Sequence, residues 1–309
     1  MKRFLKACGF LSKRIYSVLN TLPEDFGRRV CEIRLRAGKP LSLVTFDGCM
    51  YITATGRVTG LITSGLFTVS KADVKESFNR ICEYSVYSYT NDIASGFITV
   101  SGGHRAGVYG TAVYQNGKIT GVRDVGGINL RIAREYIGCG EKMMNEVMSN
   151  GFCGFLLCGA PSTGKTTLLR DCARIMSDFM FKKVTVVDER GEIAAVSHSQ
   201  VQNNVGINTD VLDGYLKPYG ILQAVRTLSP DVVVCDELGG DDDVKAVENG
   251  VNSGVDFVAA IHAVNADDIR SKPSLCSLIK TGAFKKIVFL KSGVPCDVSE
   301  ILDIGGDFL

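Results

Sequence analysis

The sequence predicts an α/β protein in which a smaller α+β domain precedes a domain with a mainly parallel, doubly wound sheet. The second domain is indicated by a Gly-rich loop between a strand-like run and a helix, and by apolar runs that alternate with helices. The first is indicated by short strand-like runs with turns between them. A chain of 309 residues can form two hydrophobic cores. We place the domains at residues 1–137 and 138–309.

The N-terminal domain begins with apolar residues at helical spacing over residues 1–22, with basic residues between them. Two interpretations fit: a helix packed in the domain core, or a basic amphipathic face that touches a membrane or a membrane partner. Residues 115–118 predict a hairpin turn, and Gly138-Cys139-Gly140 is the predicted hinge between the domains. The other expected helices cover residues 71–82 and 85–94, and the expected strands cover residues 30–35, 41–46, 50–53, 97–100, 106–114 and 118–122.

The C-terminal domain alternates apolar runs with segments of helical spacing from residue 141 onward. Most of these runs lack polar alternation, which is typical of strands covered on both faces of a parallel sheet. In such a sheet, ligands bind at the C-terminal ends of the strands. The expected strands cover residues 155–158, 184–188, 232–236, 256–261 and 287–290, and a helix is expected over residues 166–176.

The most specific motif is a Gly-rich loop with the full P-loop (Walker A) pattern. It stands between an expected strand and an expected helix, a context that disfavours a chance Gly-rich turn. Backbone N–H groups of such a loop surround a β-phosphate, and the helix adds its N-terminal dipole. Lys165 would bridge the β- and γ-phosphates, Thr166 would hold Mg²⁺, and Thr167 would reach the α-phosphate. The predicted ATP-binding residues are Gly159, Ala160, Pro161, Ser162, Thr163, Gly164, Lys165, Thr166 and Thr167.

Acidic residues follow two of the expected strands. Asp236 and Glu237 end an apolar run about 70 residues after the P-loop, which is the Walker B arrangement. Asp236 would hold Mg²⁺ through its water shell, and Glu237 would polarise the attacking water. The second cluster follows residues 184–187 and would act on the metal, Asp188 in particular, or on placement of the water; the alternative is a solvated loop. Its members are Asp188, Glu189 and Glu192.

A histidine and several arginines are further candidates. His262 ends the expected strand 256–261, so it would point to the ligand crevice and sense the γ-phosphate or hydrogen-bond Glu237. Its position alone leaves a structural role equally open. Cleavage of a γ-phosphate spreads charge over three oxygens, and such enzymes commonly add an arginine from the same chain or a neighbour. Spacing does not choose among the candidates, which are Arg105, Arg131, Arg134 and Arg226.

Composition limits the class of protein. The chain is 45% hydrophobic and 22% charged, as is normal for a globular protein, and its net charge of +2 creates no overall field for nucleic acid. Its 11 cysteines form no Cys-x-x-Cys pair and lie mostly in apolar runs, which favours a reducing cytosol. No stretch approaches about 20 uncharged apolar residues. We therefore expect a cytoplasmic protein that docks at the periphery of a membrane.

The motifs together resemble those of the secretion-type traffic ATPases, which include type II and type IV secretion ATPases and the motors of pilus extension and retraction. The resemblance covers nearly the whole chain and is greatest for a sporulation branch of that family. In chain order, the motifs are Gly-Gly-His-Arg-Ala-Gly-Val-Tyr-Gly, Asn-Leu-Arg-Ile-Ala-Arg-Glu, Gly-Ala-Pro-Ser-Thr-Gly-Lys-Thr-Thr, Val-Val-Asp-Glu-Arg-Gly-Glu-Ile-Ala, Thr-Asp-Val-Leu-Asp-Gly, Leu-Ser-Pro-Asp-Val-Val-Val-Cys-Asp-Glu-Leu-Gly and Ala-Ala-Ile-His-Ala.

The resemblance implies a RecA-like motor domain behind the smaller N-terminal domain, assembled as a hexameric ring. It implies that Arg105 and Arg131 help to complete the active site, that residues 187–194 form the family's Asp box, and that residues 259–263 form its His box, with His262. The sporulation branch implies an ATPase that energises a channel between mother cell and forespore, on the mother-cell side, together with membrane proteins. The chain departs from many relatives in lacking a tetracysteine zinc module and in reading Asp236-Glu237, where they read Gly-Glu.

Three functions compete on these observations. The leading one is a Mg²⁺-dependent ATPase whose ring motions move or assemble membrane machinery. The second is a RecA-like nucleic-acid motor, against which the near-neutral charge and the lack of an aromatic-basic stripe both count. The third is a nucleotide switch that binds ATP without hydrolysing it and only gates a partner.

Overall fold

The computed structural model describes residues 1–305. These residues form two compact units that divide between Arg134 and Glu135. We call these unit 1 and unit 2. The division falls three residues before the expected one at 137/138. Residues 306–309 of the expected second domain lie outside the described residues. Within residues 1–305, no helix has both the length and the apolar character needed to cross a bilayer.

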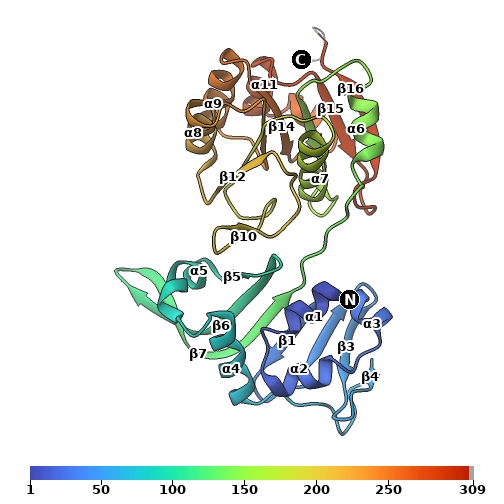
Figure 1. The fold of residues 1–309 in the computed structure, drawn as a ribbon, viewed down its shortest axis with the longest axis vertical. Coiled ribbons are helices and arrows are strands. Elements are labelled where there is room, and N and C mark those ends of the chain that lie inside the picture. The colour runs from blue at the N-terminus through green and yellow to red at the C-terminus, as the bar shows by residue number, and fades with distance from the viewer. Residues whose placement is uncertain (306–309) are drawn as a thin grey trace. The chain divides into compact units, whose positions relative to one another are not determined.

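Unit 1 contains an antiparallel sheet whose described strands follow the order β4-β3-β2-β1-β7-β6-β5 (Figure 1). Its helices are α1 (Lys2–Cys8), α2 (Lys13–Leu19), α3 (Glu24–Arg29), α4 (Lys71–Ile81), the 3₁₀ helix η1 (Val86–Tyr89) and α5 (Thr90–Ser95). Its strands are β1 (Val30–Arg36), β2 (Ser42–Thr45), β3 (Gly48–Ile52), β4 (Val58–Thr59), β5 (Phe97–Val100), β6 (His104–Gln115) and β7 (Lys118–Arg131).

The N-terminal segment forms two helices in place of the single expected one. The chain leaves α1 at Gly9, and α2 begins after Ser12, whose hydroxyl caps it by accepting the N–H of Ile15 at 3.3 Å. Phe4 and Ile15 on the apolar side are buried in the core of unit 1. This burial supports the packed-helix interpretation, because the apolar side is not available to a membrane.

The hairpin β6–β7 turns at Asn116-Gly117, as expected. Both residues have positive φ, 51° and 75°, which is the signature of a type I′ turn. Strand β7 continues to Arg131, well beyond the expected end at residue 122, through a glycine-rich stretch that weakens the strand pattern. A Cβ on Gly127 would lie 2.4 Å from the carbonyl oxygen of Leu35, so glycine allows β1 and β7 to approach.

Unit 2 contains a sheet in which the described strands follow the order β12-β9-β13-β14-β8-β15-β16, all parallel except the pair β15–β16. A separate small ribbon pairs β10 with β11. The helices are α6 (Glu141–Val147), α7 (Lys165–Asp178), α8 (Lys217–Thr227), α9 (Asp241–Asn252), α10 (Ala266–Arg270) and α11 (Pro273–Lys280). The strands are β8 (Phe155–Cys158), β9 (Val184–Asp188), β10 (Val196–Ser197), β11 (Gln200–Val201), β12 (Thr209–Asp213), β13 (Val232–Cys235), β14 (Asp256–Ile261), β15 (Lys286–Leu290) and β16 (Val298–Asp303).

Helices cover both faces of the unit 2 sheet, which explains the continuous apolar runs. Val232 and Val234 of β13 join the core under α6 and α7, whereas Val233 and Cys235 join the core under α8, α9 and α11. Each residue of a central strand is therefore buried on one side or the other. The sequence pattern missed β12 and β16, because these edge strands are only half-buried and carry polar residues.

The predicted hinge at Gly138-Cys139-Gly140 is not a free linker. The N–H groups of Gly138 and Gly140 donate to the Asp171 carboxylate of α7 at 3.1 and 2.8 Å. The segment is thereby held against unit 2, and the division between the units precedes it. A Gly-rich sequence signalled flexibility here. In the structure Gly138 has a φ of 87°, which favours glycine, and a Cβ on Gly140 would lie 3.3 Å from Oδ2 of Asp171 in α7.

Candidate functional site

The P-loop connects the end of β8 to the start of α7. Gly164, immediately before the helix, has a φ of 92°, and a Cβ there would lie 2.7 Å from the backbone nitrogen of Cys296. Glycine is therefore required both for the turn and for the contact. Lys165 is 6% exposed, and its Nζ donates to the carbonyls of Gly159 at 2.7 Å and Ala160 at 3.0 Å. Burial lowers the pKa of this lysine.

The first residues of α7 meet the end of β13. The hydroxyl of Thr166 donates to Oδ2 of Asp236 at 2.6 Å, while Oδ1 of Asp236 is buried and has no hydrogen-bond partner among the described residues. Burial raises the pKa of Asp236 despite the Thr166 hydrogen bond. A hydroxyl and a carboxylate with an unused oxygen are the oxygen donors that Mg²⁺ prefers. The residues present therefore fit a Mg²⁺ site.

Glu237 stands at the centre of a hydrogen-bonded chain. His262 Nε2 donates to its Oε1 at 2.9 Å, and Lys165 Nζ donates to Nδ1 of the same imidazole at 3.3 Å. These directions assign the ring proton to Nε2 of His262 and leave Nδ1 as the acceptor. The hydrogen bond from His262 lowers the pKa of Glu237, and the Arg190 charge adds to the effect. Glu237 has a φ of 54°, a strained backbone that aims its side chain into the site.

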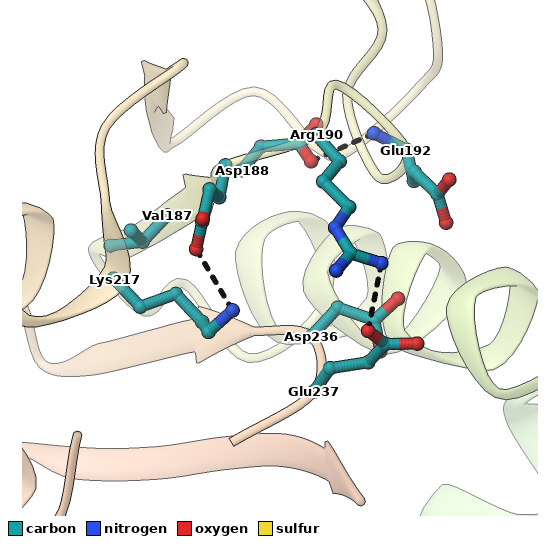
Figure 2. A pocket seen from close by; sticks show the side chains of 8 residues that line it. Val187, Asp188, Arg190, Glu192, Lys217, Asp236 and Glu237 are labelled. Atoms are coloured by element: carbon teal, nitrogen blue, oxygen red, sulfur yellow. Dashed lines mark hydrogen bonds and ion pairs between the residues drawn. The ribbon is translucent and has the colours of Figure 1, made fainter. Parts of the chain in front are cut away.

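The second acidic cluster lies at the end of β9 and in the loop that follows it (Figure 2). Asp188 is 3% exposed and accepts backbone N–H bonds at 2.8 to 3.0 Å from Glu192, Ile193 and Ala194. Glu189 is paired with Lys217 of α8 at 2.9 Å, and this hydrogen bond lowers its pKa. Figure 2 shows Arg190 reaching from this loop to Glu237. The Nη1 atom of Arg190 lies 3.0 Å from Oε2 of Glu237.

One cavity brings most of the expected site residues together. Its volume of about 380 Å³ lies in the range of ligand pockets. The residues predicted to act on phosphate, metal and water must face the same cavity. All four of them line it: Lys165, Thr166, Asp236 and Glu237. Asp188 and Glu189 line an adjacent smaller pocket instead, and Glu192, Asp236 and Glu237 line both. The cavity is lined by Pro161, Ser162, Gly164, Lys165, Thr166, Thr167, Glu192, Asp236, Glu237, His262 and Pro295.

The candidate arginines have different surroundings. In unit 1, the β6–β7 register places Arg105 directly opposite Arg131. The guanidinium of Arg105 stacks 4.6 Å from the centroid of the Phe97 ring, and Arg131 is 75% exposed, with Glu32 at 3.5 Å. Arg134 has a structural role, because its guanidinium donates to two backbone carbonyls of unit 1. In unit 2, Arg226 is exposed in the last turn of α8.

Sequence reasoning missed three residues of the site. Arg190 lies in the run Asp-Glu-Arg-Gly-Glu, so the sequence carried a signal for it, but only the carboxylates of that run were taken as site candidates. Lys217, at the first position of α8, and Pro295, in the β15–β16 loop, carried no local signal. Cys296 of the same loop donates its N–H to the carbonyl of Thr163 at 2.9 Å. That contact joins chain segments about 130 residues apart.

Comparison with known proteins identifies the family of the chain. The family described as "Sporulation stage III, protein AA" matches residues 2–309. The chain belongs to this family. It is 31% identical over 304 residues to the stage III sporulation protein AA of Bacillus subtilis (strain 168), covering 97% of this chain and 95% of the relative.

Solved structures share the fold at low sequence identity. The Legionella pneumophila ATPase DotB superposes with a TM-score of 0.53 and 14% identity, covering 94% of this chain and 75% of DotB. The pilus retraction motor PilT with bound ADP gives a TM-score of 0.55 and 14% identity, covering 90% of this chain and 80% of PilT. The chain therefore has the P-loop NTPase fold of the secretion ATPases.

Proposed function

We propose that this protein is a Mg²⁺-dependent ATPase motor that energises a sporulation-associated secretion or channel complex at the mother cell–forespore membranes. The observation that carries the ATPase part is the convergence of Lys165, Thr166, Asp236 and Glu237 on one cavity. The match to the sporulation family supports the setting. The fold shared with an ATPase and with a pilus retraction motor supports the motor.

The residues of the cavity divide the chemistry among them. Backbone N–H groups of the P-loop, to which Pro161 contributes none, and the ammonium of Lys165 hold the phosphates. For this, Lys165 must exchange its two carbonyl partners for phosphate oxygens. Thr166 and Asp236 would hold Mg²⁺, which would offset the negative charge of the bound phosphates. Glu237 orients and polarises the attacking water, and His262 fixes the orientation of Glu237.

Further parts of the proposal concern assembly. We propose that Arg105 and Arg131 stabilise the charge that develops on the γ-phosphate, and that the protein works as a homo-oligomer, a hexamer by the family resemblance. Adjacent positions across β6 and β7 allow the two guanidinium groups to act on one anion. The working location would be the cytoplasmic face of the membrane on the mother-cell side, beside membrane proteins of the same complex.

The test is Mg²⁺-dependent ATP turnover and ATP binding by the purified protein. Lys165→Ala should lose both, because no other cation in the loop reaches the phosphates. Glu237→Gln should bind ATP and turn over about 10²- to 10⁴-fold more slowly, the usual contribution of a general base. Lys245→Ala, which removes an exposed cation of α9 paired with Asp242, is the matched control and should behave as the wild type.

Three results would contradict the proposal. Normal turnover by Lys165→Ala would remove the P-loop from the reaction. ATP binding by the wild type without turnover, unchanged by Glu237→Gln, would make the protein a nucleotide switch. Turnover that requires DNA, with binding that weakens steeply as salt rises, would instead indicate a nucleic-acid motor.

A further inference from the structure

Three cysteine side chains that the proposed mechanism does not use lie close together beside the P-loop. Cys139 belongs to the segment predicted as a hinge, Cys172 to α7, and Cys296 to the loop between β15 and β16. The thiols of Cys139 and Cys296 share a hydrogen bond. A Cβ on Gly140, next to Cys139, would lie 3.6 Å from Sγ of Cys172. All three cysteines belong to unit 2, so their meeting does not depend on how the two units are arranged.

The three thiols differ in reactivity. Cys172 is fully buried, and burial raises the pKa of its thiol, so it stays protonated. Cys139 and Cys296 are both partly exposed. The hydrogen bond that Cys139 donates lowers the pKa of Cys296, because it stabilises the thiolate of the acceptor, and raises the pKa of Cys139, which must give up that proton. The thiolate is the form that reacts with oxidants, so Cys296 reacts first and Cys139 is the thiol held beside it.

The backbone of Cys296 is part of the packing around the P-loop. Its N–H donates to the carbonyl of Thr163 at 2.9 Å, and a Cβ on Gly164 would lie 2.8 Å from its sulfur. Its φ of 63° lies in the left-handed region, which costs free energy in a residue other than glycine. Because the position is strained and closely packed, a shift of Cys296 changes its contacts with the P-loop.

Cys139 is attached more firmly than Cys296. The N–H groups on either side of it, those of Gly138 and Gly140, donate at 3.1 and 2.8 Å to the carboxylate of Asp171, which is 4% exposed. Hydrogen bonds to a carboxylate are about twice as strong as the neutral N–H to carbonyl bond that ties Cys296 to the P-loop. A covalent bond between two sulfurs is shorter than a hydrogen bond between thiols, so forming it draws the two cysteines together. The Cys296 side, with the weaker attachment, is the one that moves.

We propose that Cys139 and Cys296 form a reversible disulfide, and that this bond displaces the β15–β16 loop from its contact with the P-loop and weakens nucleotide binding. The pairing rests on the contact between the two thiols, whereas its effect on nucleotide rests on the proposed function. Disulfides that form in a reducing compartment are usually transient and redox-sensing. A bond that thiols open again therefore acts as a switch on the nucleotide site.

Hydrogen peroxide is an oxidant that balances the reaction. The thiolate of Cys296 attacks one peroxide oxygen, so an S–O bond forms, the O–O bond breaks and hydroxide leaves. The sulfur of Cys139 then attacks the sulfenic acid on Cys296. An S–S bond forms, the S–O bond breaks, and the hydroxyl group departs as water with the proton of Cys139. Each sulfur has then lost one electron, and the peroxide has gained two.

The first measurement maps the bond in full-length protein treated with hydrogen peroxide. Mass spectrometry of unreduced peptides should find Cys139 joined to Cys296, and dithiothreitol should release the two peptides. The link should be absent from Cys139→Ser and from Cys296→Ser. Cys276→Ser is the matched control, since it removes another partly exposed cysteine of unit 2. It should form the link as the wild type does.

The second measurement is the Kd for Mg²⁺-ATP before and after peroxide treatment, with each variant compared with its own reduced form. The Kd of the wild type should rise about tenfold or more on oxidation, because a binding site must be held within about 0.5 Å of its working geometry. Dithiothreitol should restore the affinity, and Cys276→Ser should show the same loss and recovery. In Cys139→Ser and in Cys296→Ser, which cannot form the bond, peroxide should change the Kd less than twofold.

Other outcomes would overturn the inference. A link from Cys296 to Cys172 in place of Cys139, or no link at all, would remove the pairing. An ATP affinity that stays within twofold when the Cys139–Cys296 link is complete would remove the switch. So would a loss of affinity that persists in Cys139→Ser, since oxygen added to Cys296 alone would then explain it. If the reduced wild type binds no ATP, the proposed function fails and the effect on nucleotide fails with it, while the mapped link still decides the pairing.

Discussion

Strands β9 and β13 are neighbours in the sheet of unit 2, and each leads to an aspartate at the same edge. Asp188, at the end of β9, accepts three backbone N–H bonds and is almost fully buried. Asp236, after β13, has one hydroxyl partner and one buried oxygen with no partner in the part of the chain that the structure describes. The same residue type at the same edge therefore serves two purposes. Asp188 holds a loop, and Asp236 is available to a ligand.

The glutamates that follow repeat this contrast. Glu189 is paired with Lys217 beside the smaller pocket, whereas Glu237 lies in the main cavity between His262 and Arg190. What separates a structural carboxylate from a ligand-binding one at this edge is how fully its oxygens are already engaged, and by which groups. Backbone donors and a half-buried lysine are lasting partners, while a threonine hydroxyl or an exposed arginine can be exchanged.

The largest expected effect is the loss of metal-dependent turnover in Asp236→Asn. The amide cannot supply the negative charge that holds Mg²⁺ through its water shell, so kcat should fall on the order of 100-fold. Stability should not fall. The raised pKa of Asp236 means that the folded state disfavours its ionised form at neutral pH, and the neutral amide relieves that cost. Turnover against Mg²⁺ concentration and urea unfolding at pH 7 are the two measurements.

Asp243 offers a control for this variant. It is a buried aspartate of the same unit whose carboxylate accepts the N–H groups of Gly239 and Gly240 at the start of α9. Asp243→Asn should lower stability and leave the Mg²⁺ dependence unchanged. If Asp236→Asn keeps its Mg²⁺ dependence, Asp236 is not the metal-holding group and the contrast with Asp188 is lost.

The second effect is a loss of stability in Asp188→Asn. An amide in this position keeps one acceptor oxygen but turns an NH₂ group toward backbone donors, so at least one buried N–H loses its partner. The free energy of unfolding should fall by roughly 2–4 kcal/mol, the cost of losing charge-assisted hydrogen bonds and leaving a buried donor unsatisfied. Urea unfolding measures this change. The apparent Mg²⁺ affinity of the folded fraction should stay within about twofold of the wild type.

An opposite result would restore the sequence-based expectation for Asp188. A variant that unfolds like the wild type but needs far more Mg²⁺ would place Asp188 among the metal ligands, as its position at the sheet edge suggested. Asp188 therefore stays a predicted metal ligand until that measurement, although its three backbone partners favour the structural role.

The sequence predicted those parts of the site whose residues are contiguous in the chain. The P-loop and the Asp236-Glu237 pair each follow a buried apolar strand, so their shared position at the strand ends could be derived. The strands of the sheet centre were predicted for the same reason, as uninterrupted apolar runs. Edge strands β12 and β16 were not, because half-buried strands alternate with polar residues and resemble loops.

The remaining features depend on contacts between distant segments. The local sequence pattern does not distinguish the engaged carboxylate of Asp188 from the more available one of Asp236. The difference arises because residues 192–194 fold back onto the end of β9. The contact of Cys296 with the P-loop, and the ties between Asp171 and the predicted hinge, are likewise set by chain segments that meet only in the fold. Residue type indicates which chemistry a side chain can perform. Tertiary contacts determine whether the polar atoms of that side chain are already engaged by the fold.

The smallest expected effect concerns Glu189→Gln. Lys217 lowers the pKa of Glu189, so the pair adds stability above the unfolded-state pKa, about 4.3, and loses it as the pH falls through the lower folded-state value. Both side chains are partly exposed, which limits the loss at pH 7 to about 1 kcal/mol or less. The difference between variant and wild type should shrink in acid unfolding curves as the pH falls through the lowered pKa of Glu189. Turnover should stay within about twofold of the wild type.

Lys217→Met tests the same pair from the other side. If Glu189 and Lys217 act only on each other, the effects of Glu189→Gln and Lys217→Met on stability should not add in the double variant. Turnover is the sharper measurement, because Glu189 and Glu237 both follow the aspartate at a strand end. A Glu189→Gln variant that loses as much activity as Glu237→Gln would move the water-activating role to the end of β9. The engagement of a carboxylate in the resting structure would then be a poor guide to its use in catalysis.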